Sequence, residues 1–405
     1  MTVKMPEYEA IEYENILCES RKINELLKKG ELLRCKRVSS KKLYNVYQLL
    51  VKKDLENLVE ENVESFIEKS SVLIFDLRGK DEILRSGFMI NNSVECNDSF
   101  EKVKSAFNAL NKDVISQKDR KNVILYDENG SISENEEDTE ISIKKKDLGL
   151  HGSLYQNEIK YYFKKCIKLV KNIYILKGGF RDFYDEFPFL CCPVSKSEDA
   201  KFMPISKYKS PKDIPDYLKS RIIASIEYPI VISWGQNFKI YLANIVQGCH
   251  PYILKTLNIK TVFDLTPNKI ENSSKGDDIK FIHIKRSKSD SKYNKCCDTV
   301  NDKQAENIPL LEETINALKE LENISNYEEI FPLAIVSTNI TNDIVSISAV
   351  IVSHLRRWKI TSTLVFLLGQ LCLDNHLITP TENKDIYNKI HPTNQQITNM
   401  LSFEF

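Results

Sequence analysis

Apolar residues in the first half of the chain fall into short runs that are typical of buried strands. Residues 72–75, 123–126 and 173–176 are each four consecutive apolar or aromatic positions. Residues 155–170, between the second and third runs, have apolar residues at helical spacing. Because strands and helix alternate, the pattern predicts a parallel sheet covered by helices.

A second set of apolar runs begins at Ile230 and predicts a second sheet. The last of these runs leads into a polar loop and then into an apolar pattern over residues 344–358, which predicts a long helix. The chain is therefore expected to contain two α/β domains in tandem. The expected strands of the second domain are residues 230–232, 240–242, 261–264, 281–284 and 333–336.

Composition narrows the class of protein. With 57 basic and 57 acidic residues in 405, the chain lacks the positive excess typical of a nucleic-acid-binding face. Ten cysteines without a C-x-x-C spacing predict reduced thiols rather than a disulfide scaffold. No run of about eighteen apolar residues appears, so no membrane span is expected. The acidic N-terminus lacks the apolar segment of a signal peptide, which predicts a cytoplasmic protein.

A glycine turn after the third apolar run carries a resemblance to a known family. Residues 175–180 (ILKGGF) are followed by Phe183 and by residues 186–188 (EFP), and residues 76–78 (DLR) follow the first run. Paired glycines permit the backbone angles that a tight strand-to-helix turn needs. These segments resemble the rhodanese-like domain of MAP-kinase phosphatases, which implies a rhodanese-like parallel α/β sheet.

Residues 228–400 resemble a dual-specificity phosphatase domain, which implies an α/β domain with helices on both faces. A rhodanese-like domain followed by a phosphatase-like one is the order found in MAP-kinase phosphatases. The chain is similar to their inactive relatives, the serine/threonine/tyrosine-interacting-like pseudophosphatases. The segments that carry this second resemblance are residues 230–232, 240–244, 257–262 and 377–383.

The resemblance and the composition together divide the chain into four parts. Residues 1–38 are expected to form a helical, variable extension, and residues 39–192 the rhodanese-like domain. Residues 131–150 of that domain are an acidic insert, typical of a solvated loop. Prolines among lysines and serines predict a linker at residues 193–227, which leaves residues 228–405 for the phosphatase-like domain.

By the resemblance, the phosphate-binding loop should lie at residues 336–343, where its chemistry is absent. A cysteine phosphatase needs a thiolate at a helix N-terminus, a small-residue loop and an arginine that grips the phosphate. Ser337 stands at the nucleophile, Val336 at the preceding histidine, Ile340 at a glycine and Asp343 at the arginine. Asp343 would also bring a like charge into a cradle meant for a dianion.

The other catalytic positions implied by the resemblance are altered as well. Ser287 and Lys288 fall where the family keeps the aspartate that protonates the leaving oxygen. The rhodanese-like loop at residues 127–131 has no cysteine to carry a persulfide. We therefore predict a non-catalytic, protein-binding pseudophosphatase without a cofactor or a metal. The alternative is a residual, atypical phosphatase acting on phosphoserine, phosphothreonine or phosphotyrosine.

A simple structural role also accounts for the end of the degenerate loop. Thr341, Asn342 and Asp343 precede an apolar helical pattern and are good N-cap residues. We expect Asn342 or Asp343 to cap that helix. His354 falls inside the helix and is predicted to be a packed or surface residue.

A short basic segment is a candidate docking motif, and a solvated basic turn is the favoured interpretation of it. Lys144, Lys145 and Lys146, followed by Leu148 and Leu150, fit a kinase-docking pattern. The resemblance implies partners such as MAP kinases, a mitochondrial phosphatase or a stress-granule assembly protein, and roles in apoptotic and stress signalling. It also adds the mitochondrion to the cytoplasm as a location. No nucleic-acid partner is expected.

Overall fold

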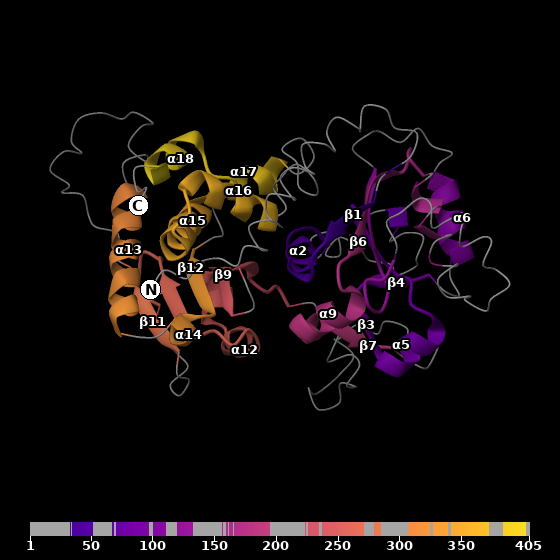
Figure 1. The fold of residues 1–405 in the computed structure, drawn as a ribbon, viewed down its shortest axis with the longest axis horizontal. Helices are drawn as coiled ribbons and strands as arrows, with labels where there is room; N and C mark the ends of the chain where they lie inside the picture. Colours follow the sequence, from indigo (N-terminus) through magenta and orange to yellow (C-terminus); the bar gives the residue numbers. More distant parts are fainter. Residues whose placement is uncertain are drawn as a thin grey trace.

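The chain forms two five-stranded sheets, each with helices packed against it, and one two-stranded ribbon. The first sheet, indigo to magenta, and the second, orange, lie side by side along the long axis (Figure 1). These elements come from a computed structural model. It describes residues 33, 35–51, 67–68, 70–96, 100–110, 120–132, 156, 159–160, 162–164, 166–194, 223, 226–234, 237–270, 279–284, 307–324, 327–338, 342–371 and 384–401.

The first sheet is parallel throughout, with the strand order β1-β6-β5-β2-β4. The three apolar runs predicted from the sequence are its central strands β2, β5 and β6, which are covered on both faces and are therefore apolar at successive positions. The strands are β1 (Cys35–Val38), β2 (Val72–Asp76), β4 (Ser93–Glu95), β5 (Lys121–Tyr126) and β6 (Val170–Leu176).

Alternate residues of these central strands point into two different cores. Leu73 and Leu125 face α6 (Phe100–Leu110), where Phe107 and Phe163 fill the space. Ile74, Ile124 and Tyr174 face the opposite way, toward the first domain's other helices. The remaining short elements are α2 (Ser40–Val46), η2 (Tyr47–Val51), α5 (Lys80–Ser86), α9 (Gly179–Glu186), η5 (Pro188–Leu190) and the antiparallel ribbon of β3 (Phe88–Ile90) with β7 (Cys191–Pro193).

The second sheet has the order β11-β10-β12-β9-β8, with β8 antiparallel to β9 and the other pairs parallel. Each strand coincides with a run predicted from the sequence, so both the expected fold class and the expected strands are confirmed. The strands are β8 (Ile230–Trp234), β9 (Phe238–Asn244), β10 (Thr261–Asp264), β11 (Lys280–His283) and β12 (Leu333–Ser337).

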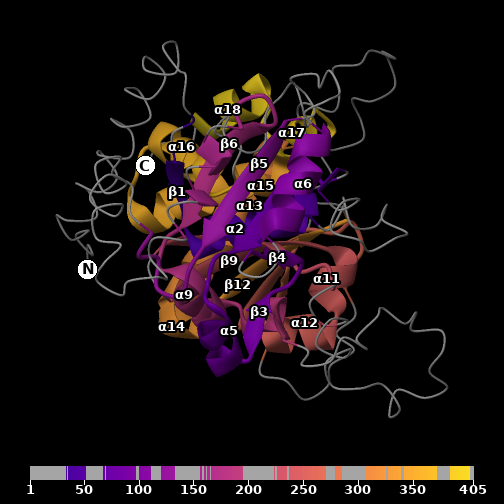
Figure 2. The ribbon, with the colours of Figure 1, turned by 90° about the vertical axis from the view of Figure 1, so that its right-hand side faces the viewer.

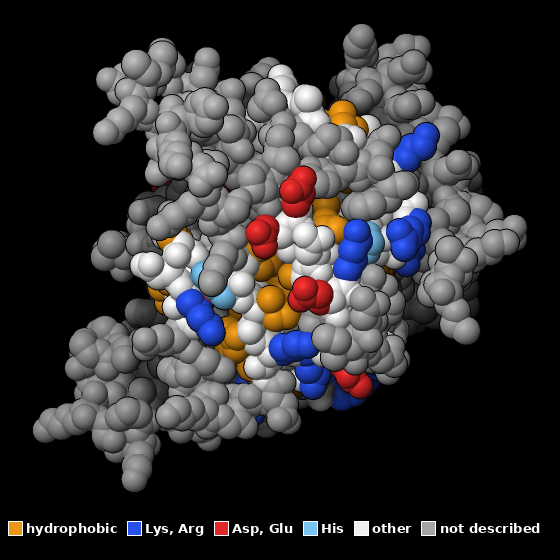
Figure 3. Space-filling model, turned by 90° about the vertical axis from the view of Figure 1, so that its left-hand side faces the viewer, with side chains coloured by type: hydrophobic (Ala, Val, Ile, Leu, Met, Phe, Trp, Pro, Cys, Tyr) orange, Lys and Arg blue, Asp and Glu red, His pale blue; other side chains and the backbone are white. Residues whose placement is uncertain are grey.

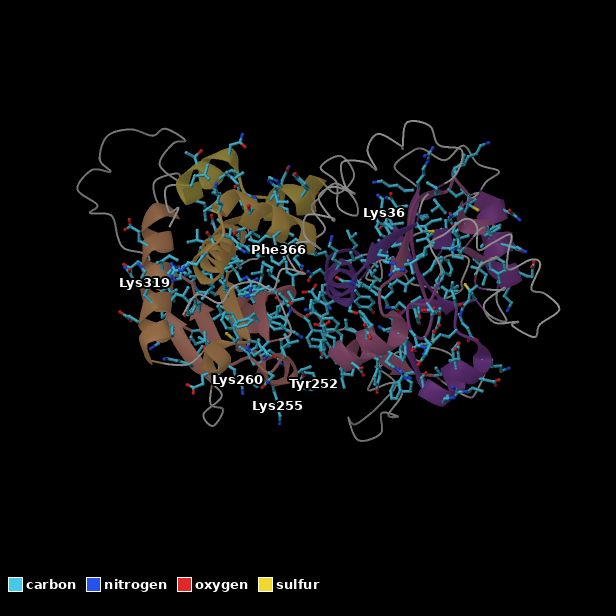
Figure 4. The ribbon with its side chains drawn as sticks, viewed as in Figure 1. Lys36, Tyr252, Lys255, Lys260, Lys319 and Phe366 are labelled. Carbon is cyan, nitrogen blue, oxygen red and sulfur yellow. The ribbon has the colours of Figure 1, made fainter. Side chains whose placement is uncertain are left out.

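Helices cover both faces of the second sheet, as expected. Helices α11 (Ile245–Cys249) and α12 (Pro251–Thr256) lie on one face, below the sheet in Figure 4, where Tyr252 and Lys255 are labelled. Phe366 of α16 marks the opposite, upper face. The helices of that side are α13 (Asn307–Ile324), α15 (Asn342–Arg356), α16 (Ile360–Gln370), α17 (Lys384–Ile390) and α18 (Asn394–Leu401), while α14 (Tyr327–Ile330) leads into β12.

The first domain begins earlier than residue 39. Strand β1 pairs in parallel with β6, Cys35 opposite Ile173 and Val38 opposite Leu176, so residues 35–38 belong to the sheet and not to an extension. The pattern missed β1 because it is a short edge strand with two basic residues at its centre. Pro193, predicted as the first linker residue, likewise ends β7.

The two domains share one continuous hydrophobic core. Apolar residues of α2 and of the inward face of the first sheet belong to the same cluster as those of β8, β9 and β12. Figure 2 looks onto the first sheet, with the second domain behind it. A linker between two separate domains was expected, but the two domains are packed directly on each other. None of the described helices has both the length and the apolar character needed to cross a bilayer.

Candidate functional site

The carboxyl ends of parallel strands form the edge at which α/β proteins place their ligand-binding loops. In the first sheet, the loop after β5 lies at this edge beside the turn that follows β6, which opens α9. In the second sheet, the segment from β12 into α15 lies at the corresponding edge. These are the two loops that the sequence singled out.

Asp127 fills the centre of the loop after β5 with its own carboxylate. Its Oδ1 atom accepts a hydrogen bond from the backbone N–H of Gly130 at 2.5 Å, and its Oδ2 atom accepts from the backbone N–H and the hydroxyl of Ser131 at 2.7 and 2.6 Å. Asp127 is only 1% exposed. Amides that could have faced an external anion are therefore bonded to a carboxylate of the chain itself.

The same loop is held against the glycine turn at the start of α9. A side chain on Gly130 would place its Cβ 2.5 Å from the backbone nitrogen of Gly178, and one on Gly179 would meet Gly130 in the same way. Gly178 and Gly179 both have positive φ, 75° and 63°, which explains the paired glycines seen in the sequence. Phe180 and Arg181 donate their backbone N–H groups to the loop carbonyls of Asp127 and Glu128. These first-turn amides of α9 are thus already bonded.

Arg78 bonds Glu128 of this loop, and all of its donors have partners. Its Nε and Nη2 atoms bond Asp76, Nη2 also bonds the Phe88 carbonyl, and Nη1 bonds Ser86 and Glu128. A guanidinium has five N–H groups, so none is left for an anion from solution.

The Asp76–Arg78 pair is deeply buried, and both side chains are fully covered. Burial alone would lower the pKa of Arg78, but the hydrogen bonds and charge of Asp76 raise it above its usual value. The ring of Phe180 stacks beneath the guanidinium with 3.8 Å to the ring centroid. The DLR segment identified in the sequence is therefore a structural network at the base of the loop.

In the second domain, Val336 and Ser337 end β12. The side chain of Val336 is buried against α11, close enough that a Cβ on Gly248 would lie 2.4 Å from it. Ser337 is partly exposed and lies opposite Asn244 of β9. Val336 is thus a core residue, while Ser337 is partly exposed at the end of the strand. Ile340 lies outside the described residues.

Asp343 is tied to a different helix. Its Oδ1 atom accepts a hydrogen bond from Nε2 of Gln396 in α18 at 2.6 Å. Helix α15 begins at Asn342, so Asn342 and Asp343 lie in its first turn, and the expected N-cap role for either residue is wrong by one or two positions. An acidic side chain in a first turn still complements the helix dipole. His354, in the last turn, is buried, which agrees with a packed residue.

A buried carboxylate that the sequence did not reveal lies next to this loop. Asp264, at the end of β10, accepts hydrogen bonds from Thr266 and from the backbone N–H of Ile270, and it bonds Nδ1 of His283 at 2.9 Å. The pair joins the ends of two adjacent strands, β10 and β11. Ser287 and Lys288 follow β11 but lie outside the described residues.

The structure leaves part of the predicted site untested. Lys144, Lys145, Lys146, Leu148 and Leu150 lie outside the described residues. Within the described part of the chain, no group of three or more His, Cys, Asp or Glu side chains is arranged to hold a metal ion. No disulfide joins two of the described cysteines.

Residues 59–186 match the family model described as Rhodanese-like domain. The match covers about a third of the chain, and the chain therefore carries a rhodanese-like domain in its N-terminal half. Strands β2, β4, β5 and β6 and the loop of Asp127 all fall inside the matched range.

Two structures of one Saccharomyces cerevisiae protein are similar to part of the chain. They are described as a yeast protein tyrosine phosphatase of the rhodanese family and as a homolog of single-domain rhodanese and the Cdc25 phosphatase catalytic domain. They are 12% and 11% identical, cover 38% of this chain and 87% and 82% of their own, and have a TM-score of 0.22. A likeness of this size carries no functional argument. No curated protein matches the sequence.

Proposed function

We propose that this chain is a catalytically inactive pseudophosphatase that acts by binding other proteins. The observation that carries the proposal is the carboxylate of Asp127, which occupies the amides of the loop where a rhodanese-like enzyme holds its reactive group. A bound phosphate or persulfide would need those amides and would meet a like charge there.

The second domain supports the same conclusion by a different route. Ser337 carries a hydroxyl group where a cysteine phosphatase has a thiol of low pKa, and a serine needs a neighbouring base to act as a nucleophile. His283 bonds Asp264 through Nδ1, and it lies on β11, which is two strands away from β12 in the sheet order. Asp343, where the resemblance implies an arginine, is an acceptor bonded to Gln396 and cannot grip a phosphate.

The proposed partners are proteins in phosphatase, MAP-kinase, stress-granule or apoptotic signalling, in the cytoplasm or the mitochondrion. The equal numbers of acidic and basic residues favour proteins over nucleic acid. Figure 3 looks onto the end of the second domain, where described side chains of both charges lie among apolar ones.

Enzyme assays on the full chain test the inactivity. Purified protein is incubated with an aryl phosphate and, separately, with thiosulfate and cyanide. We expect rates at the buffer background, unchanged by Ser337→Ala, and no calorimetric binding of sulfate. The neighbouring exposed hydroxyl supplies a matched control, Thr338→Ala. Turnover that is lost in Ser337→Ala and kept in Thr338→Ala would establish the residual phosphatase instead.

A pull-down tests the binding role and its proposed docking segment. The full chain is compared with a variant in which Lys144, Lys145 and Lys146 are changed to Gln. We expect this variant to lose partners that a control retains. The control changes three exposed lysines of the second domain to Gln: Lys255, Lys260 and Lys319, labelled in Figure 4. Equal capture by both variants would reject the docking segment.

A further inference from the structure

Strand β8 is the edge of the second sheet, and its outer side faces the first domain. In the antiparallel pair with β9, Ile230 lies opposite Leu242 and Ile232 opposite Ile240. The backbone of Val231, between them, points away from β9, because successive residues of an edge strand alternate in direction. Exposed backbone groups of this kind accept strands from other chains unless the protein covers them.

Asn45, on helix α2 of the first domain, bonds these outward groups as a neighbouring strand would. Its Oδ1 atom accepts from the backbone N–H of Val231 at 2.8 Å, and its Nδ2 atom donates to the Val231 carbonyl at 2.7 Å. The same Nδ2 donates to the carbonyl of Gln370, the last residue of α16, at 2.9 Å. One buried amide therefore satisfies an edge strand and a helix C-terminus of the other domain.

Neighbouring residues extend this contact along the segment before β8. The hydroxyl of Tyr44 donates to the carbonyl of Pro229 at 2.6 Å, and Oε1 of Gln48 accepts from the backbone N–H of Tyr228 at 3.0 Å. The ring of Phe189 lies 4.4 Å, centroid to centroid, from that of Tyr228. Successive backbone groups of the second domain are thus bonded to side chains of the first.

A charged contact closes the side of the interface near β9. Glu186, at the end of α9, pairs with Lys41 of its own domain at 3.7 Å and with Lys239 of β9 at 3.1 Å. The ammonium of Lys239 also lies over the ring of Phe187, 5.6 Å from the centroid. Apolar, hydrogen-bonded and ionic contacts therefore act together across the same boundary.

We propose that α2 is a built-in cover for the β8 edge and that it joins the two domains into one cooperative folding unit. In this arrangement the first domain is a structural part of the second, and the β8 edge is closed to strand addition by a partner. A binding partner then meets one rigid body and not two domains on a flexible linker.

The full-length wild-type protein provides the first test. Trp234 and Trp358, the two tryptophans of the chain, both lie in the second domain, so their fluorescence follows the unfolding of that domain. Hydrogen exchange read by mass spectrometry reports strands of the first domain in the same urea series. We expect coincident transitions. A first domain that unfolds at a clearly different urea concentration would overturn the proposal.

The second test removes the covering amide. Asn45→Leu keeps the size of the side chain and loses its three hydrogen bonds. We expect exchange protection of the β8 amides to fall at least tenfold and the two transitions to separate. The matched control is Asn91→Leu, another buried asparagine whose side-chain bonds, to Tyr47 and Cys192, stay within the first domain. The control should keep coincident transitions at a lower midpoint.

If Asn45→Leu keeps the exchange protection that β8 has in the wild type, and its two transitions still coincide, the role of α2 as a cover is overturned. Because the wild-type measurement needs no variant, a failure of Asn45→Leu to fold leaves the cooperative unit testable. The enzyme assays test the proposed inactivity and the unfolding measurements test the coupling of the domains, so either proposal can be rejected without the other.

Discussion

Replacing Asp127 by alanine should destabilise the first domain more than most single substitutions. The carboxylate is buried and accepts three hydrogen bonds, two from backbone N–H groups and one from a hydroxyl. Hydrogen bonds to a charged group contribute about 1.5 kcal/mol or more each, and the alanine leaves their donors without an acceptor. We therefore expect a loss of about 3–5 kcal/mol in the free energy of unfolding.

Urea unfolding followed by circular dichroism and by hydrogen exchange of β5 measures this loss. Asp127→Asn keeps one acceptor oxygen and loses the charge, so it should cost about half as much as the alanine. Asp185→Ala, which removes an exposed carboxylate from α9, is the control and should stay within about 0.5 kcal/mol of wild type. A cost below about 1 kcal/mol for Asp127→Ala would refute the view that this carboxylate organises the loop.

Three further predictions concern the networks around the two loops. Arg78→Met should cost about 3–5 kcal/mol because it leaves Asp76 charged and buried, and adding Asp76→Leu should recover part of that cost in a double-mutant cycle by urea unfolding. Gly248→Ala should cost about 1–3 kcal/mol by crowding Val336, and Val336→Ala should rescue it in thermal unfolding; equal midpoints for the single and double variants would contradict the contact. The third prediction is alkaline unfolding. Burial raises the pKa of several tyrosines, among them the fully buried Tyr44, Tyr47 and Tyr126. Above about pH 10 the unfolded chain loses these protons while the folded one keeps them, so stability should fall by about 1.4 kcal/mol per pH unit for each group, measured by urea titrations from pH 9 to 11.

The central strands were predictable because a strand that is buried on both faces has apolar residues at successive positions. The apolar run at residues 123–126 lies in strand β5, which has β6 on one side and β2 on the other. Four consecutive apolar residues are the pattern expected of such a strand. β1 left no such trace, because an edge strand needs apolar residues on only part of its surface. Its membership in the sheet depends on pairing with β6, more than a hundred residues later.

The residues at the candidate site can be read from the sequence, but their contacts cannot. The sequence shows directly that Ser337 and Asp343 stand where the resemblance implies other residues. It does not show that Asp343 bonds Gln396, or that Asp264 meets His283, because each contact joins residues from different elements. Asp127 could have been found: an aspartate two residues before Asn-Gly, as in residues 127–131 (DENGS), is typical of a turn in which the side chain accepts local N–H groups.

The loop after β5 and the glycine turn of α9 are held together through their backbones. A cysteine gained in the loop by one mutation would still find the first-turn amides of α9 bonded to the carbonyls of Asp127 and Glu128. Separating the loop from the turn would require the backbones at Gly130 and Gly178 to move apart. A change of one side chain in the loop therefore leaves these backbone contacts in place.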